Sequence, residues 1–486
     1  MRRSLSRFCF GQYATTRTSS DAKCPGVTIA APAGRVRTRR RDAAPVPTRP
    51  PRCYTWSHIE RDTPLKIRWI HTADVHLGYQ QYGSAQRADD FARAFQHVCE
   101  HAIRERVDFV LIAGDLFHKR AVDPRTMTQA FDLLTTLKVA GIPTLCVEGN
   151  HERAFYNLNM TWLSFLSTND LLYLLEPDDS AGLSTLAPWD PHERTGGYVD
   201  IGPARIYGIK YYGASAPQVL QRVADQLAGE AERPFGIVML HEGMEGQIPR
   251  STGGLSGTQL EVLRPHCEYL ALGHIHKRYD FGGWAYNPGS LETVSSEETQ
   301  WDRGYYVVEA DTESRTLLHV QHHINPRRPF HRVFVHVEAC TTPESLEQVA
   351  LREIERTLID GTAARPVLDV TLVGTLQFAD DALKLDRLET HVRERWDPLV
   401  VRVKNSTVRV GQSFEGTLGP DGQIDRRALE LQVFQQLLAG DSRYERHAAE
   451  WAQSVQEVKD SALQKLPPEE IVTLLERGIE RAGGLP

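Results

Sequence analysis

Short runs of apolar residues alternate with segments of helical periodicity in the first part of the chain. The segments 66–78, 108–120 and 142–153 predict apolar strands that end in polar residues, and the apolar run of the second is nearly continuous. Between the first two, apolar side chains recur at helical spacing: Phe91, Ala92, Phe95, Val98, Cys99 and Ala102. Residues 124–141, with proline near the start and glycine at the end, predict a second helix. This order predicts an α/β fold whose parallel strands are buried on both faces.

Further apolar segments predict additional strands. They lie at 205–213, 235–243, 268–276, 284–292 and 303–311. The last two could extend a sheet, because they follow the earlier strands after short polar connections. All of these elements are assigned to one domain, residues 66–325.

A smaller domain is expected over residues 326–415. Two segments with alternating apolar residues, 330–339 and 365–374, predict strands, and 345–358 and 381–396 have helical spacing. Residues 425–486 are expected to form helices joined by linkers. Two interpretations of these helices stay open: a helical element that binds a partner, or a packed pair of terminal helices.

Residues 1–65 differ from the rest of the chain. They are rich in Arg, Pro, Thr and Ala and have no periodic apolar pattern, which predicts a disordered tail. The composition is also similar to an organellar transit peptide, and a wrongly placed start codon is a third interpretation. The segment has no apolar core of the kind that a secretory signal needs.

The length and composition indicate a protein of several ordinary domains. A chain of 486 residues predicts two to four domains, and 41% hydrophobic with 24% charged residues is a globular balance. No run of about 18 apolar residues predicts a membrane span. The seven cysteines are scattered and form no CxxC pair, which favours a reducing compartment, and we expect the cytoplasm.

Charge is unevenly distributed along the chain. The net charge is −7, but residues 1–52 carry +10, so that the remainder carries −17. Nucleic-acid affinity depends mostly on neutralising phosphates, and an acidic body opposes it. A nucleic-acid substrate would therefore need local basic patches, bound cations or a partner subunit.

Five predicted strands end in side chains that can bind a metal. These side chains are Asp74 and His76, then Asp115 with His118 three residues later, then Asn150 and His151, then His241, and finally His274 and His276. Sites in open α/β sheets form beyond the carboxyl ends of the strands. We therefore expect these side chains to converge, although the last pair alone would also fit a solvated surface loop.

The types of side chain indicate the class of metal. Carboxylate, imidazole and amide oxygen without thiolate favour Mn²⁺, Fe or Zn²⁺. Two aspartates and at least three histidines exceed what one ion needs, so a pair of ions bridged by a carboxylate fits better. Such a pair can bind a phosphate and activate water for an in-line displacement, and a nearby histidine can protonate the leaving oxygen.

The order D-x-H, GD, GNH, a lone His and G-H-x-H resembles the calcineurin-like metallophosphoesterase superfamily over residues 67 to about 310. HTADVHLG, GDLFHK and LALGHIHKRY followed by NPGSLE are similar to the SbcD-type DNA repair exonucleases, the nuclease subunit of a double-strand-break repair complex. The resemblance implies a β-sandwich flanked by helices (α-β-β-α), a small α+β capping domain and C-terminal helices. It also implies a homodimer and an SbcC-type ABC ATPase docked on those helices.

The resemblance implies a role for each strand-end residue. One divalent ion would be bound by Asp74, His76, Asp115 and His276. The other would be bound by Asp115, Asn150, His241 and His274, so that Asp115 bridges the two ions. His151 would contact the scissile phosphate and assist the leaving group, and His118 would act beside it.

One residue departs from the family pattern. The family usually reads GNHD, and Glu152 stands here in place of that aspartate. A carboxylate at this position can orient the neighbouring imidazole of His151. The extra methylene of glutamate leaves that geometry open.

Three functions are considered. The first is a DNA exonuclease or endonuclease with two metal ions, expected to be Mn²⁺, acting in double-strand-break repair. The second is a metal-dependent phosphodiesterase or phosphatase for small phosphoesters, and the third is a metal-stabilised scaffold without activity. The capping domain and His118 favour the nuclease over the second, because a small substrate needs neither, and the complete set of ligands disfavours the scaffold.

Overall fold

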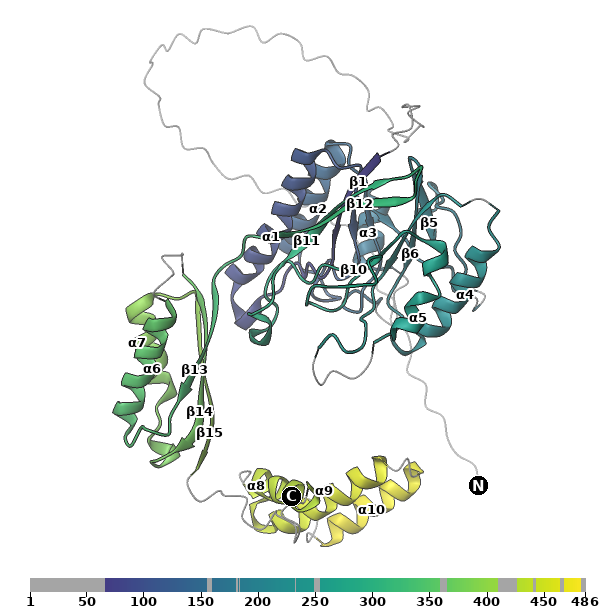
Figure 1. Cartoon of the computed structure of the whole chain (residues 1–486). Coiled ribbons are helices and arrows are strands. Elements are labelled where there is room, and N and C mark those ends of the chain that lie inside the picture. Colours follow the sequence, from purple (N-terminus) through teal and green to yellow (C-terminus); the bar gives the residue numbers. More distant parts are fainter. Residues whose placement is uncertain are drawn as a thin grey trace, which may run out of the picture. The chain divides into compact units, whose positions relative to one another are not determined.

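The computed structural model describes most of the chain from Lys66 to Arg481 (Figure 1). The described residues are 66–154, 160–180, 182, 184–231, 233–248, 254–358, 365–409, 426–439, 443–463 and 467–481. The predicted tail, residues 1–65, lies outside them, and so do residues 410–415 at the end of the predicted capping domain.

The first sheet has six strands in the order β12-β11-β1-β2-β3-β4. Its strands are β1 (Lys66–Thr72), β2 (Phe109–Ile112), β3 (Thr144–Cys146), β4 (Tyr173–Leu174), β11 (Gly304–Asp311) and β12 (Thr316–Ile324). Strands β1 to β4 are parallel, and β11 is antiparallel to both β1 and β12. The parallel part is the alternation of strands and helices that the sequence predicted, whereas β12 was not predicted.

Two helices cover one face of this sheet (Figure 1). They are α1 (Ala85–Glu105) and α2 (Pro124–Val139), and a short helix, α3 (Trp162–Thr168), leads into β4. Phe95 of α1 and Leu134 of α2 share a buried apolar cluster with Val110 of β2. The Asp123 carboxylate caps α2, because it accepts hydrogen bonds from the first free N–H groups of the helix, as expected at a helix start followed by proline.

The second sheet has the order β5-β6-β7-β8-β10-β9. Its strands are β5 (Tyr198–Ile201), β6 (Ala204–Ile209), β7 (Phe235–Leu240), β8 (Tyr269–Leu272), β9 (Tyr279–Phe281) and β10 (Ala285–Asn287). The four inner strands are parallel, and β5 and β9 are antiparallel edge strands. Helix α4 (Ala216–Ala228) packs on its outer face with Leu220 and Val223, and α5 (Gly257–Glu261) lies on the same side.

The two sheets pack face to face. Trp69, Phe109 and Leu111 of the first sheet share one buried cluster with Ile237, Met239 and Tyr269 of the second. The Trp69 ring stacks on Phe109 at 5.7 Å and meets Tyr269 edge-on at 5.2 Å. Helices therefore cover the outside of each sheet and the sheets enclose the core, which confirms the predicted β-sandwich flanked by helices.

A fully buried histidine links the two sheets below their carboxyl ends. His71 of β1 hydrogen bonds through Nδ1 to the Tyr269 hydroxyl at 2.9 Å and through Nε2 to the Leu272 carbonyl at 3.0 Å. Leu272 is the last residue of β8. The imidazole thus fixes how the end of β1 lies against the end of β8.

A separate sheet of three parallel strands follows, with β13 (Phe330–His336), β14 (Val367–Leu376) and β15 (Val400–Arg409) in that order. Helices α6 (Pro343–Leu358) and α7 (Leu385–Trp396) pack on one face through a common core with Val335 and Val370. The strands and helices predicted for residues 326–415 are present, and β15 is an addition. The limits of this domain stay a prediction.

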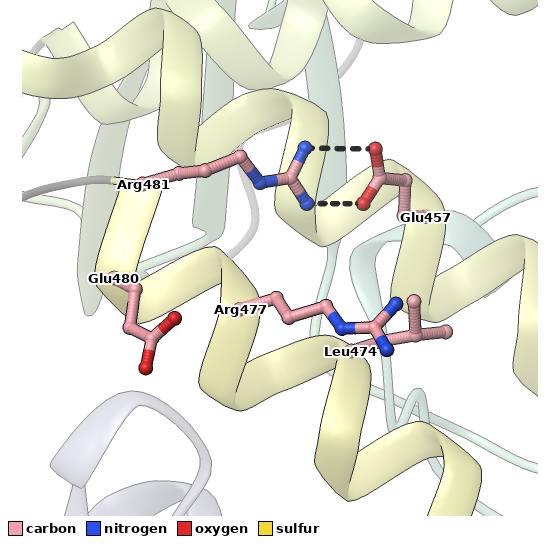
Figure 2. Close-up of a pocket in the computed structure, with 5 residues that line it drawn as sticks. All are labelled: Glu457, Leu474, Arg477, Glu480 and Arg481. Carbon is pink, nitrogen blue, oxygen red and sulfur yellow. Dashed lines mark hydrogen bonds and ion pairs between the residues drawn. The ribbon is translucent and has the colours of Figure 1, made fainter.

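The C-terminal segment contains three helices, α8 (Arg426–Ala439), α9 (Ala448–Leu463) and α10 (Pro468–Arg481). Lys459 of α9 pairs with Glu430 of α8, and Arg481 of α10 pairs with Glu457 of α9 (Figure 2). The helices thus pack on one another, and partner binding by them stays a prediction. Within the described residues, no helix combines the length and apolar character that a membrane crossing requires.

We expect His71→Phe to lower the free energy of unfolding at pH 7 by about 2 kcal/mol, because two buried polar groups lose their partner. Burial lowers the pKa of His71 from 6.5 to about 3, so the neutral ring stabilises the folded state above pH 6.5 and this contribution is lost as the pH falls. The difference between wild type and variant should therefore shrink from pH 7 to pH 5, by up to about 1.4 kcal/mol per pH unit. Urea unfolding of both proteins at pH 7 and pH 5 measures this difference in the free energy of unfolding.

The exposed His319 of β12 supplies the control. His319→Phe should change the free energy of unfolding by less than about 0.5 kcal/mol at both pH values. A His71→Phe protein as stable as the wild type at pH 7 would contradict a stabilising role for the link between the sheets.

Candidate metal centre

The ends of five parallel strands from both sheets meet at one edge of the sandwich. The first sheet supplies the residues that follow β1, β2 and β3, and the second supplies those that follow β7 and β8. Three overlapping groups of possible ligands form there: Asp74, His76 and His276; Asp74, Asp115 and His241; and His76, His118 and His151. Within each group the ligand atoms lie within 4.8 Å of one another. The structure thus brings together the residues that the sequence singled out.

One oxygen of Asp115 lies at the centre of this arrangement. Its Oδ2 is 3.4 Å from Nε2 of His241, 3.9 Å from Nε2 of His151 and 4.0 Å from Nε2 of His76. Its other oxygen, Oδ1, accepts a hydrogen bond from the backbone N–H of His151 at 3.0 Å. One oxygen therefore anchors a neighbouring loop and the other faces the histidines.

Asp74 divides its oxygens in the same way. Its Oδ1 accepts a hydrogen bond from the backbone N–H of His274 at 3.1 Å, while its buried Oδ2 has no hydrogen-bond partner among the described residues. The backbone N–H of Asp74 in turn donates to the Gly114 carbonyl at 3.1 Å. The loops that follow β1, β2 and β8 are thus bonded to one another at the site.

The backbone at the site adopts conformations that are unfavourable for residues with a side chain. Asp74, His76, Asp115 and His274 all have φ between 50° and 77°, in the left-handed region. Such residues persist only where the surrounding structure holds them, and they gather at functional sites. Here the hydrogen bonds between the loops supply that restraint.

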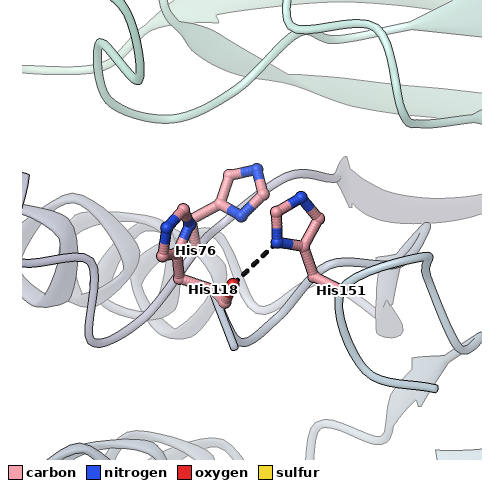
Figure 3. Close-up of side chains that lie close together, drawn as sticks. All are labelled: His76, His118 and His151. Carbon is pink, nitrogen blue, oxygen red and sulfur yellow. Dashed lines mark hydrogen bonds between the residues drawn. The ribbon is translucent and has the colours of Figure 1, made fainter. Parts of the chain in front are cut away.

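The Nδ1 atoms of three histidines are bonded to groups that can only accept. His151 bonds to the His118 carbonyl at 2.7 Å (Figure 3), His241 to the Ala113 carbonyl at 2.7 Å, and His276 to the Glu298 carboxylate at 2.9 Å. Each Nδ1 therefore carries the hydrogen, and each Nε2 is turned toward the other ligands.

Several contacts between these groups bring together atoms that one shared cation can satisfy. Nε2 of His76 lies 3.1 Å from Nε2 of His276, and Oδ1 of Asn150 lies 3.1 Å from Nε2 of His241 and 2.9 Å from Nδ1 of His274. A proton can bridge one such pair of atoms, whereas a metal ion can bind several of these atoms at once. With the unpartnered Oδ2 of Asp74, the nitrogen and oxygen donors fit divalent metal ions.

The electrostatics of the site favour bound cations. Burial opposes ionisation of Asp115, but the facing His241 holds the pKa of this carboxyl well below its usual range. Burial would lower the pKa of His241, but the charge of Asp115 raises it to about 10. Burial lowers the pKa of His118 and of His274 to about 4, so these rings are neutral and can serve as ligands or hydrogen-bond partners near neutral pH.

Glu152 does not orient the neighbouring imidazole, which was the role that the sequence suggested for a carboxylate there. It is buried and accepts hydrogen bonds from the backbone N–H groups of Asp115 at 3.1 Å, Phe117 at 2.8 Å and Gly149 at 3.0 Å. The ring of His151 is held by the His118 carbonyl instead. Glu152 therefore joins the loop after β2 to the loop after β3.

Two further residues touch this set through contacts that the sequence did not predict. Glu298 accepts the hydrogen bond from His276, and the Tyr79 ring stacks on His118 at 3.7 Å between ring centroids. Both lie outside the ends of the five strands. Tyr79 follows D-x-H closely, so its place near the site was predictable, whereas no periodic pattern points to Glu298.

A family model described as calcineurin-like phosphoesterase matches residues 67–278, which contain all of the strand-end ligands. Residues 67–278 form a calcineurin-like phosphoesterase domain. The predicted calcineurin-like phosphoesterase domain is thereby confirmed over these residues, which carry the strand-end site.

Several curated relatives of this chain carry the name DNA double-strand break repair protein Mre11. The protein of Archaeoglobus fulgidus is 31% identical over 239 residues, which cover 48% of this chain and 52% of the relative. That of Halobacterium salinarum is 29% identical over 369 residues, 75% of this chain and 85% of the relative. That of Methanosarcina mazei is 46% identical over 360 residues, 71% of this chain and 51% of the relative. The chain thus spans about half the length of the first and third of these relatives.

We expect Glu152→Ala to destabilise the phosphoesterase domain by about 3 kcal/mol or more, because three buried N–H groups would lose their acceptor. Mn²⁺ should also raise the melting temperature less than in the wild type, because the loops carrying Asp115 and His151 are no longer joined. Thermal unfolding with and without Mn²⁺ measures both effects. Glu193→Ala, at an exposed turn, is the matched control and should leave both values unchanged. Equal melting temperatures for Glu152→Ala and the control would refute this role.

Proposed function

We propose that this protein is a two-metal DNA nuclease that hydrolyses phosphodiester bonds during double-strand-break processing. The observation that carries the proposal is the convergence of five strand ends from two sheets, with Oδ2 of Asp115 facing three imidazoles and Asp74 facing His276. A carboxylate oxygen that faces several imidazoles is suited to bridge two cations.

In this proposal the ligands divide as the family resemblance implies. Asp74, His76, Asp115 and His276 would hold one ion. The other would be held by Asp115, Asn150, His241 and His274. Mn²⁺ suits this mixture of nitrogen and oxygen donors. When bound, two such ions supply positive charge that polarises the phosphate and lowers the pKa of the attacking water.

His151 is placed to serve the leaving group. Its side chain is 34% exposed, whereas Asp115 is 2% exposed and His76 and His241 are fully buried, so a phosphate entering from solvent can reach the imidazole of His151. Its Nδ1 hydrogen is fixed on the His118 carbonyl, which leaves Nε2 to hold a proton for the departing oxygen. His118 would act beside it, with its ring held by Tyr79.

The shared name of the relatives supports DNA as the substrate. An acidic body is compatible with DNA if bound cations neutralise the site and a partner adds affinity. We propose a homodimer and an ATPase of the SbcC type that binds α8 to α10, where Leu437, Leu463 and Val472 are exposed. A reducing compartment, the cytoplasm, suits the buried free thiols of Cys99 and Cys146.

The runner-up is a phosphodiesterase for small phosphoesters, which the same metal site would support. A test compares linear DNA with bis-p-nitrophenyl phosphate, using the full chain with Mn²⁺, Mg²⁺ or EDTA. We expect degradation of DNA that requires Mn²⁺ and falls at least about 100-fold in His151→Ala, because the leaving oxygen loses its proton donor. His319→Ala, on the exposed face of β12, should keep full activity.

The two substrates separate the two functions. Hydrolysis of the small diester with DNA left intact, even after a candidate ATPase is added, would favour the phosphodiesterase. Degradation of DNA that persists in EDTA would refute the two-metal mechanism.

A further inference from the structure

We infer that Glu298, held in place by Arg303, is a positioning residue that sets the orientation and basicity of His276 and so the affinity of one of the two ion sites. The inference rests on the proposed two-metal function. Neither residue lies at the end of one of the five strands whose ends form the site, and neither is within the segment that the family model matches.

His276 needs support from outside its own strand. It is the fourth residue after the end of β8, and its side chain is 19% exposed, whereas that of Asp74 is fully buried. The strand therefore does not fix the ring. Its Nε2 lies 3.8 Å from Oδ1 of Asp74 and 3.1 Å from Nε2 of His76, so a small rotation of the ring would carry Nε2 away from both.

Glu298 fixes this ring from the side opposite the ligands. Its Oε1 accepts the hydrogen bond from Nδ1 of His276 at 2.9 Å. Its Oε2 accepts from the backbone N–H of Val294 at 3.2 Å and pairs with Nη2 of Arg303 at 2.9 Å. Both oxygens are thus engaged, and Glu298 is itself buried. The carboxylate has little freedom to move away from the imidazole.

Arg303 stabilises the main chain of both His276 and Glu298. Its side chain is fully buried, and Nη1 donates to the backbone carbonyl of His276 at 2.7 Å and to the Ser290 hydroxyl at 2.6 Å. Nη2 also donates to the backbone carbonyl of Glu298 at 2.7 Å. One guanidinium therefore fixes the main chain of His276 and the residue that holds its ring.

The partner of His276 differs from those of the other histidines of the site. His151 and His241 are bonded at Nδ1 to backbone carbonyls, which are neutral, and Nδ1 of His76 has no hydrogen-bond partner. A carboxylate that accepts from Nδ1 makes Nε2 a stronger donor toward a metal. Loss of such a partner weakens metal binding about 10-fold to 100-fold.

The effect should fall on one ion. His276 groups with Asp74 and His76, whereas the group of Asp74, Asp115 and His241 does not include it. Removing the charge of Glu298 should therefore weaken the first site and leave the second nearly unchanged. A residue that merely stabilised the fold would affect both sites equally.

The test uses the full chain with Glu298→Gln, which keeps the shape of the side chain and removes its charge. Mn²⁺ binding is followed by calorimetry and by electron paramagnetic resonance, which distinguishes a coupled pair of ions from single ones. We expect one of two Mn²⁺ to bind 10-fold to 100-fold more weakly and the other within about 2-fold of the wild type. The signal of the coupled pair should give way to that of single ions at limiting Mn²⁺.

Glu297→Gln is the matched control, because Glu297 is the exposed neighbour in the same turn. It should bind both ions as the wild type does. Glu298→Asp keeps the charge but moves it away from His276 by the length of one methylene, so it should give an intermediate loss of Mn²⁺ affinity at the same site. It keeps the inference testable if the glutamine variant does not fold.

Two outcomes would overturn the inference alone. Either the wild type binds a pair of ions and Glu298→Gln binds them equally well, or both sites weaken together in both Glu298 variants. A wild type that binds no pair of Mn²⁺ would instead refute the proposed function, and the inference with it.

Discussion

The packing of the two sheets against each other is the constraint on which the site depends. No single sheet carries all of the candidate ligands, because Asp74, Asp115 and Asn150 follow strands of the first sheet and His241 and His274 follow strands of the second. The inner apolar faces fix the distance between the sheets, and the hydrogen bonds of His71 fix how their ends align. A polar link of this kind tolerates less sliding than apolar contacts alone, because hydrogen bonds are directional.

Electrostatic attraction between Asp115 and the facing histidines stabilises the arrangement of side chains at the strand ends. Burial disfavours a charged carboxylate, yet Asp115 keeps its charge because His241 and His76 face it. Its two oxygens make different contacts: Oδ1 accepts a hydrogen bond from a backbone N–H, and Oδ2 faces the imidazoles. Glu152 also stabilises this arrangement. Its carboxylate accepts hydrogen bonds from three backbone N–H groups and so joins the loop of Asp115 to the loop of His151. The longer side chain still reaches all three donors, which explains how glutamate can stand where the family usually has aspartate.

The loop between β10 and β11 links the metal site to the beginning of the smaller domain. Glu298 and Arg303 reach His276 from this loop, while the Arg303 carbonyl accepts a hydrogen bond from the backbone of Asn325 at 2.7 Å. Arg327 donates to the Thr293 hydroxyl at 2.8 Å. One loop thus contacts both a metal ligand and the connection that leads into β13, so the position of His276 and the path of this connection are not independent.

The sequence by itself singled out the candidate ligands, and the tertiary structure decided what holds them in place. Polar residues at the ends of apolar runs were sufficient to single out Asp74, Asp115 and His276, because parallel strands place their carboxyl ends at one edge. The parallel strands of the first sheet were also predictable, since alternating strands and helices allow few other folds. The second sheet as a separate layer, the strand β15 and the roles of His71, Glu152 and Glu298 were not derivable from local patterns. Each depends on contacts between residues far apart in the chain, such as His71 with Tyr269, and hydrophobic periodicity carries no information about such pairs.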